Sequence, residues 1–219
     1  MISARLIGIA RLVLVIAACA LWTAARSPAL ASTCTLADHI KSANTNTSVG
    51  NCPAGTSHDI ITISEDIRLT ELLPPITGTI TIEGGGHSIS GAGKFPIFWV
   101  KGGNLTINDL TLKRANSENI QQGLGGTAID AQDSKLTVNK SSFVGNIGSA
   151  IVIWRSTVEI NSSSFVANRD RYGSGGAIFV GQGVTLDVNI ARSAATTREA
   201  EEARWLPEFR RIWELSPPE

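Results

Sequence analysis

The stretch SFVGNIGSAI, residues 142–151, has a longer counterpart in SFVANRDRYGSGGAI, residues 164–178. Both copies contain Ser-Phe-Val-x-Asn, then a turn rich in Gly or Ser, then Ala-Ile. Extending the comparison outward aligns LTINDLTL (105–112) with LTVNKSSF (136–143) and VEINSSSF (158–165). In all three segments the first and last residues are apolar and equally spaced. This self-similarity predicts one supersecondary unit per repeat.

Short apolar segments recur throughout the middle of the chain, and ITI at 61–63 and at 80–82 belongs to the same series. The segments alternate apolar and polar residues and are separated by Gly, Asn or Ser, which is typical of strands and turns. The last apolar residue of each strand is expected at Ile63, Ile82, Ile107, Val138, Ile160 and Leu186. A spacing of roughly 20 to 30 residues is typical of a solenoid.

The sequence therefore predicts an all-β fold, a right-handed parallel β-helix over residues 59–190. Stacked rungs bury a continuous core, and the hand follows from the right-handed preference of parallel crossovers. Phe143 and Phe165 are expected to stack inside it, and Asn146 and Asn168 to form an amide ladder at a turn. Asparagines in Asn-x-Ser/Thr positions are also expected to stack: Asn46, Asn104, Asn139 and Asn161. A leucine-rich repeat is the alternative at this period, but leucine is too sparse.

The chain resembles the bacterial right-handed parallel β-helix repeat proteins with polymorphic-outer-membrane-protein-like repeats. The resemblance rests on a Gly-Gly-Ala-Ile element, at 175–178, paired with Phe-x-x-Asn at 143–146 and 165–168. Weaker copies of the first element occur at 126–129 and 148–151. The resemblance covers about residues 34–190 and implies a fold rather than one activity, since such folds serve adhesins, secreted passengers and polysaccharide enzymes.

Residues 1–31 have the pattern of a signal peptide. Arg5 and Arg11 precede an apolar stretch at 12–22, and a small-residue cleavage site ends at Ala31. An alternative is lipidation of Cys19, because Ile-Ala-Ala-Cys resembles a lipobox; simple cleavage is favoured because apolar residues continue beyond Cys19. Either route predicts an exported protein, secreted or at the cell surface, that meets a membrane only through this segment.

Two cysteines, Cys34 and Cys52, remain after cleavage and are expected to form a disulfide in an oxidising compartment. Residues 32–58 are predicted to be an N-terminal cap. Within it, Thr35 followed by Asp38 fits a helix N-cap, and one helical face carries Leu36, Ile40 and Ala43.

Residues 191–219 differ abruptly from the repeats. Gly disappears, and Trp205, Phe209, Ile212 and Trp213 lie on one face of a predicted helix. Two interpretations stay open: a helical cap over the last rung, or the frameshifted or truncated end of a longer repeat protein.

The formal net charge is zero, which argues against a nucleic-acid partner. The length variation between repeats falls on one side of the coil, at 114–126 and 169–176, and loops on one face of a repeat array often bind partners. The candidate binding residues for a polysaccharide or a surface protein are Asn119, Gln121, Gln122, Arg169, Asp170, Arg171 and Tyr172.

No residue is assigned a catalytic role. Asp130 and Asp133 share a turn and could form a carboxylate pair. Asp is common in turns because of its own hydrogen bonding, so the pair alone does not indicate catalysis. The histidines are not spaced with cysteines or carboxylates as metal ligands, so no metal or cofactor is expected. Trp99 and Trp154 are expected in the core or at an edge. The leading hypothesis is a non-enzymatic binding or adhesion protein; the alternatives are a β-helix polysaccharide lyase or glycoside hydrolase, and a fragment of a larger surface protein.

Overall fold

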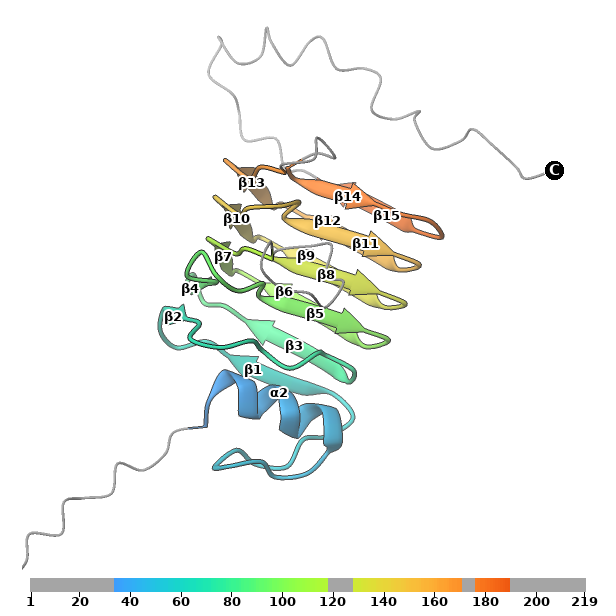
Figure 1. Cartoon of the computed structure of the whole chain (residues 1–219). Helices are drawn as coiled ribbons and strands as arrows, with labels where there is room; N and C mark the ends of the chain where they lie inside the picture. Colours follow the sequence, from blue (N-terminus) through green and yellow to red (C-terminus); the bar gives the residue numbers. More distant parts are fainter. Residues whose placement is uncertain (1–33, 118–127, 171–175, 190–219) are drawn as a thin grey trace, which may run out of the picture. The chain divides into compact units, whose positions relative to one another are not determined.

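The computed structural model describes residues 34–117, 128–170 and 176–189, which form a parallel β-solenoid with one short helix (Figure 1). The strands form three parallel sheets of six, five and four strands, and each complete rung contributes one strand to each sheet. The predicted all-β class is therefore confirmed. The right hand of the coil stays a prediction. The signal peptide, Cys19 and the segment 191–219 lie outside the described residues.

The first sheet has the order β1-β3-β6-β9-β12-β15. Its strands are β1 Asp59–Thr62, β3 Thr79–Glu83, β6 Asn104–Asn108, β9 Lys135–Asn139, β12 Thr157–Asn161 and β15 Thr185–Asn189. The second sheet has the order β2-β4-β7-β10-β13, with β2 Ile67–Arg68, β4 Ser88–Ser90, β7 Thr111–Lys113, β10 Ser142–Val144 and β13 Ser164–Val166. The third has the order β5-β8-β11-β14, with β5 Phe98–Lys101, β8 Ile129–Gln132, β11 Ile151–Trp154 and β14 Ile178–Val180.

The register confirms the alignment of the central repeats. One column across the rungs contains Leu105, Leu136 and Val158. A second column contains Leu112, Phe143 and Phe165. The expected position of the first and last strands is wrong by two residues. Ile61 rather than Ile63 pairs with Ile82, and Val188 rather than Leu186 pairs with Ile160.

The core forms because alternate side chains of all three sheets point into the coil, as the period of two in a strand requires. Ile82, Ile107 and Val138 are fully buried in the first sheet. The rings of Phe143 and Phe165 stack with 4.7 Å between centroids and 6° between planes, as predicted. At the β15 end the core thins out: Val180 and Val188 are 47% and 39% exposed in the described part of the chain.

Side-chain amides form two ladders between rungs. In the longer one, each Nδ2 donates to the amide or carboxylate oxygen of the rung before it, at 2.8–3.0 Å. Its members are Glu83, Asn108, Asn139, Asn161 and Asn189. The expected stacking of Asn139 and Asn161 is thus confirmed. That of Asn46 and Asn104 is wrong, because Asn46 is the C-cap of the helix and Asn104 pairs in register with Thr79 and Lys135. The residue after each central ladder asparagine has a positive φ, which turns the chain towards the second sheet.

The shorter ladder is buried, and it is the one predicted from Phe-x-x-Asn. Asn146 is fully buried, and its Nδ2 donates to Asn168 Oδ1 at 2.8 Å and to the Leu112 carbonyl at 3.2 Å. Its Oδ1 accepts from the Ala115 amide at 2.9 Å. The side chain thereby satisfies backbone groups that the turn leaves unpaired, which removes a desolvation penalty.

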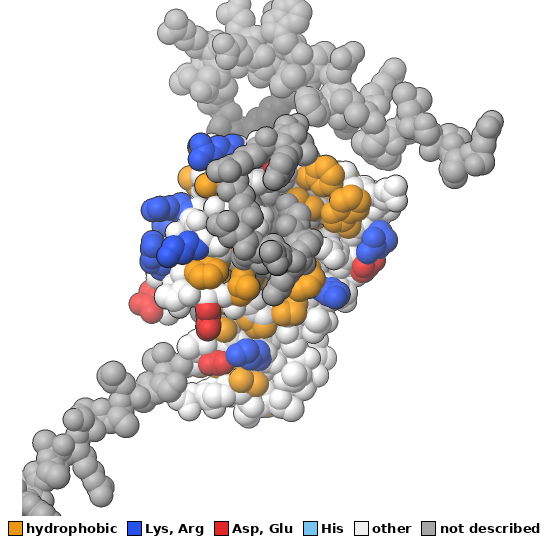
Figure 2. Space-filling view, in the orientation of Figure 1, with side chains coloured by type: hydrophobic (Ala, Val, Ile, Leu, Met, Phe, Trp, Pro, Cys, Tyr) orange, Lys and Arg blue, Asp and Glu red, His pale blue; other side chains and the backbone are white. Residues whose placement is uncertain are grey.

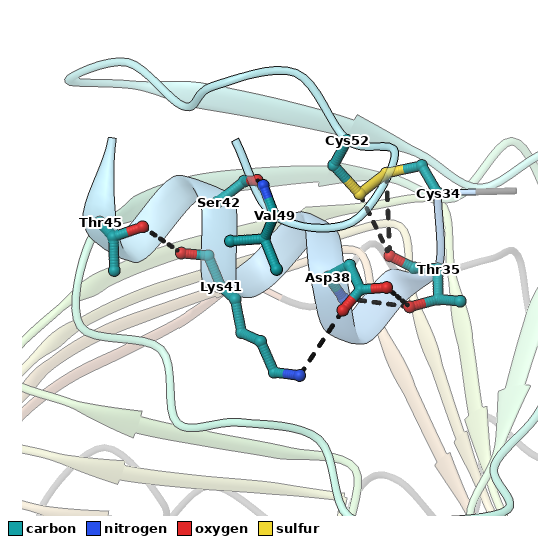
Figure 3. Close-up of polar contacts among 8 residues, drawn as sticks. All are labelled: Cys34, Thr35, Asp38, Lys41, Ser42, Thr45, Val49 and Cys52. Atoms are coloured by element: carbon teal, nitrogen blue, oxygen red, sulfur yellow. Dashed lines mark hydrogen bonds and ion pairs between the residues drawn. A yellow bond between two sulfur atoms is a disulfide. The ribbon is translucent and has the colours of Figure 1, made fainter. Parts of the chain in front are cut away.

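Helix α2, Leu36–Thr45, lies against β1 and β3 at the start of the solenoid (Figure 1). Ile40 and Ala43 join the hydrophobic core, as the helical pattern predicts. Thr35 is the N-cap: its Oγ1 accepts from the Asp38 amide at 3.1 Å, the contact drawn in Figure 3. Among the described residues, no helix has the length and apolar character needed to cross a membrane.

The predicted disulfide between Cys34 and Cys52 is present and joins residues 18 apart in sequence (Figure 3). It ties the residue before the helix to the segment that follows it. Closing a loop of this length stabilises a fold by about 3 kcal/mol in the chain-entropy description. The short helix is therefore held in place by its buried face and by a covalent link.

Candidate functional site

The outer face of the third sheet gathers most of the half-buried aromatic residues among the described strands. In each strand, the residues that alternate with the core positions point away from the core. One outward column pairs Trp99 with Asp130, Val152 and Phe179 across the rungs. A second pairs Lys101, Gln132 and Trp154. We call these seven residues the aromatic face. None belongs to the hydrophobic core cluster. Of the two expected positions, core or edge, Trp99 has the edge position, on β5, whereas Trp154 lies on the outer face of β11, which is not an edge strand.

Two aromatic rings of this face, those of Trp154 and Phe179, lie close together across neighbouring rungs. The centroids of Trp154 and Phe179 are 5.6 Å apart with tilted planes. Trp154 lies over Gly181, where a Cβ would approach the indole to about 2.1 Å. Because glycine leaves that space open, the indole can lie flat on the sheet. Figure 2 shows hydrophobic side chains gathered on the side where β11 and β14 run in Figure 1.

Polar groups stand beside the rings. The Lys101 ammonium lies 5.2 Å from the Trp99 ring centroid, within range of a cation–π contact. Gln132 Nε2 donates to Asp130 Oδ1 at 3.0 Å, and the Asp130 side chain is buried although it lies in an outward column. Trp99 Nε1 is buried and has no hydrogen-bond partner among the described residues. An unpaired buried donor is uncommon and costly.

The predicted binding loops lead directly into this sheet. The insertion after β7 ends at β8, and the insertion after β13 ends at β14. Arg169 is exposed, and its backbone forms an isolated parallel bridge with Ile147, which bridges in turn to Asn116. Asp170 is half-buried. The other predicted binding residues, Asn119, Gln121, Gln122, Arg171 and Tyr172, lie outside the described residues.

Asp130 and Asp133, the carboxylates that share a turn, have different surroundings. Asp133 follows β8 with φ of 51°, and both its oxygens accept from Arg155, at 2.6 and 2.8 Å. The hydrogen bond from Arg155 holds the pKa of Asp133 below its ordinary value. A carboxyl group that is held ionised in this way is a poor general acid.

A second polar cluster lies on the outer side of the second sheet. Asp66 lies 3.6 Å from the Lys113 ammonium and 3.9 Å from His87 Nδ1. Its pKa is lowered, first by hydrogen bonds from Ser88 and then by Lys113. All three charged or titratable groups are substantially exposed, and the cluster contains no aromatic ring. It resembles an ordinary surface charge network.

The structure brings His39 to the disulfide, a placement that its spacing in the sequence did not suggest. Its ligand nitrogen and the sulfur atoms of Cys34 and Cys52 all lie within 4.8 Å of one another. His58 instead contacts Thr81 through Nε2 at 3.0 Å. The first helical turn positions His39 here, because its amide donates to the Thr35 carbonyl beside both sulfur atoms.

Comparison of the chain with protein-family models, with curated proteins and with solved structures gives no match. The parallel β-solenoid therefore rests on the repeat and the strand register, and the site rests on its own geometry.

Proposed function

We propose that this protein is an exported, non-enzymatic binding protein of the adhesion type, which recognises a polysaccharide on its aromatic face. The observation that supports this most directly is the alignment of Trp99, Trp154 and Phe179 on one outer surface beside polar groups. Sugar rings present apolar C–H faces and hydroxyl edges. Aromatic side chains that combine a flat apolar surface with polar neighbours suit such a ligand.

The arrangement of the face suits an extended ligand better than a compact one. Neighbouring strands in a sheet lie about 4.8 Å apart, so the aromatic residues of β5, β11 and β14 are spread along the stacking direction. Lys101 and Gln132 offer hydrogen-bond donors to sugar hydroxyl or carboxylate oxygens. The segments that contain the predicted binding loops lead from β7 and β13 of the second sheet into β8 and β14 of this sheet.

Export is supported by the Cys34–Cys52 disulfide, which fits an oxidising compartment. We also propose that the chain is related to the bacterial proteins with polymorphic-outer-membrane-protein-like repeats. Support comes from the paired Gly-Gly-Ala-Ile and Phe-x-x-Asn elements, whose phenylalanines stack and whose asparagines form a ladder.

The test is affinity electrophoresis of the purified protein through gels that contain neutral glucans or acidic polyuronates, with and without Ca²⁺. We expect retardation by at least one polysaccharide. Trp99→Ala and Trp154→Ala should each weaken it by about tenfold or more, as for an aromatic residue at the centre of an interface. Ile60→Ala is the matched control, because Ile60 is 67% exposed on the first sheet.

Two outcomes would contradict this proposal. Retardation that is unchanged in both tryptophan variants would place the ligand elsewhere. The appearance of new reducing or unsaturated ends in the polysaccharide would replace binding with cleavage and favour the lyase or hydrolase alternative. The thermal midpoint of each variant shows whether a loss of binding comes from unfolding.

A further inference from the structure

The environment of the disulfide contains a donor set that disulfide formation alone does not require. Two sulfur atoms and one imidazole nitrogen converge within 4.8 Å. Cys52 is buried, whereas Cys34 and His39 are half-buried, so the cluster is reachable from solvent on one side. Thiolate sulfur and imidazole nitrogen are the ligands that Zn²⁺ prefers, and sites with three protein ligands leave a fourth position for water.

We propose that the reduced form of this protein binds Zn²⁺ through Cys34, Cys52 and His39. The site alternates with the disulfide: the same two sulfur atoms either bond to each other or bind the metal. The proposal does not depend on polysaccharide binding, because the cluster lies at the start of the solenoid and uses no residue of the aromatic face.

The chemistry balances with a thiol reductant as co-reactant. A dithiol supplies two electrons and two protons, the S–S bond breaks, each cysteine becomes a thiol, and the dithiol becomes a disulfide. Zn²⁺ then displaces the two thiol protons to solvent and takes a nitrogen lone pair from neutral His39.

The local fold favours this exchange. Cys34 immediately precedes the N-cap of α2, where the helix dipole stabilises a thiolate. Asp38 does not compete as a ligand, because its carboxylate accepts from Thr35 Oγ1 at 2.9 Å and pairs with Lys41 at 3.5 Å (Figure 3). A bound metal would close the same loop as the disulfide, so the helix would stay tied to the segment that contains Cys52 in both redox states.

The experiment uses the full-length protein reduced with a water-soluble phosphine, which takes up an oxygen atom from water as it reduces the disulfide to two thiols. The reductant is removed without air, and Co²⁺ is added as a spectroscopic substitute for Zn²⁺. We expect one Co²⁺ per chain, with a thiolate-to-metal charge-transfer band in the near ultraviolet that Zn²⁺ abolishes. The oxidised protein should show no band.

The variants separate this site from adventitious binding. Cys34→Ser should remove most of the band, and His39→Ala should weaken Co²⁺ binding by about tenfold or more. His58→Ala, which changes a histidine bound to Thr81, should bind like the wild type. Equal binding by the His39→Ala variant, or by the oxidised protein, would overturn the proposal.

A second measurement tests the site even if reduction of the disulfide unfolds the structure around it. Alkylation of the two thiols is followed with and without Zn²⁺, and far-ultraviolet circular dichroism is recorded in parallel. We expect Zn²⁺ to slow alkylation of both cysteines together in the wild type but not in His39→Ala. A reduced protein that neither gives the band nor gains protection from Zn²⁺ would rule the site out, whatever its circular dichroism.

Discussion

The outer faces of the first and third sheets both stack residues in columns across the rungs. They differ in whether the polar groups of these columns have hydrogen-bond partners. On the first sheet, the amides of Asn108, Asn139 and Asn161 bond to one another, so the polar groups are satisfied within the column. On the third sheet, Trp99 Nε1 has no partner among the described residues, and the ring of Trp154 is half-buried over a glycine. The first column satisfies its polar groups from rung to rung, whereas the third sheet leaves one buried donor unpaired among the described residues.

Under the proposed function, this difference would separate the residues that stabilise the fold from those that bind a ligand. The ladder repeats asparagine because each amide in its middle must donate to the rung before it and accept from the rung after it. A binding face need not repeat one residue type, because its contacts are made to a ligand rather than from rung to rung. The asparagine column is uniform over four rungs, while the aromatic face changes residue type at each step. Substitutions in the first should alter stability, and those in the second should alter binding.

The largest effect on stability is expected at the buried asparagine ladder. In Asn146→Ala, the Ala115 amide and the Leu112 carbonyl both lose a side-chain partner inside the protein. Leaving such groups unpaired should lower the free energy of unfolding by about 3 kcal/mol. Urea denaturation followed by circular dichroism measures this directly.

The matched control is Asn168→Ala, in the next rung. Asn168 is half-buried, and its Nδ2 donates to the Phe143 carbonyl at 2.9 Å. Its loss also frees the two Asn146 donors that Asn168 Oδ1 accepts, but Asn168 itself is partly reached by water, so we expect a smaller cost of about 2 kcal/mol. Equal losses in the two variants would show that burial does not set the strength of the ladder.

On the aromatic face, Gly181→Ala tests whether the position of the Trp154 ring matters for binding. The added methyl group would meet the indole, so the ring must move off the sheet. We expect polysaccharide affinity to fall by about tenfold, which corresponds to about 1.4 kcal/mol. A second glycine-to-alanine change at Gly183 would be a poor control, because its φ of 66° strains any residue with a side chain. The exposed substitution Ile60→Ala is therefore used as the control again. Full affinity in Gly181→Ala would mean that the indole of Trp154 does not contact the ligand in the position seen here.

The sequence predicted the stacking well where the repeats share a length, and less well at their ends. The Phe-x-x-Asn pairs gave the buried ladder correctly because Asn146 and Asn168 follow their phenylalanines at the same spacing. Ile63 and Leu186 were misassigned because a shift of two residues keeps every side chain on the same face, so alternation cannot detect it. Only the backbone pairing with Ile82 and Ile160 resolves the shift.

The candidate site was harder to predict, for a related reason. Trp99, Trp154 and Phe179 share no local motif, and their placement on one sheet depends on the register between rungs that are separated by insertions of different length. The disulfide was predictable because only two cysteines remain after the predicted cleavage at Ala31. The approach of His39 to it was not, since it depends on how the segment after the helix folds back.

A smaller effect on stability is expected in the exposed asparagine ladder. Asn139→Ala removes a link between Asn108 and Asn161 at a position that water partly reaches. We expect the free energy of unfolding to fall by about 1 kcal/mol, with no change in polysaccharide affinity. Urea denaturation and affinity electrophoresis of the same preparation give both values. A weaker affinity would show that the two faces are not independent.

The smallest effect is expected from the exposed pair of Asp133 and Arg155 beside the aromatic face. Because the hydrogen bond from Arg155 lowers the folded-state pKa of Asp133, the pair stabilises the protein above the ordinary carboxyl pKa of about 3.9. That contribution is lost as the pH falls through the lower, folded-state pKa. Asp133→Asn keeps a side chain that tolerates the positive φ but removes the charge. The urea midpoints of wild type and variant should differ slightly at neutral pH and converge in acid. A difference that persists below the pKa would assign the effect of Asp133 to its turn rather than to Arg155.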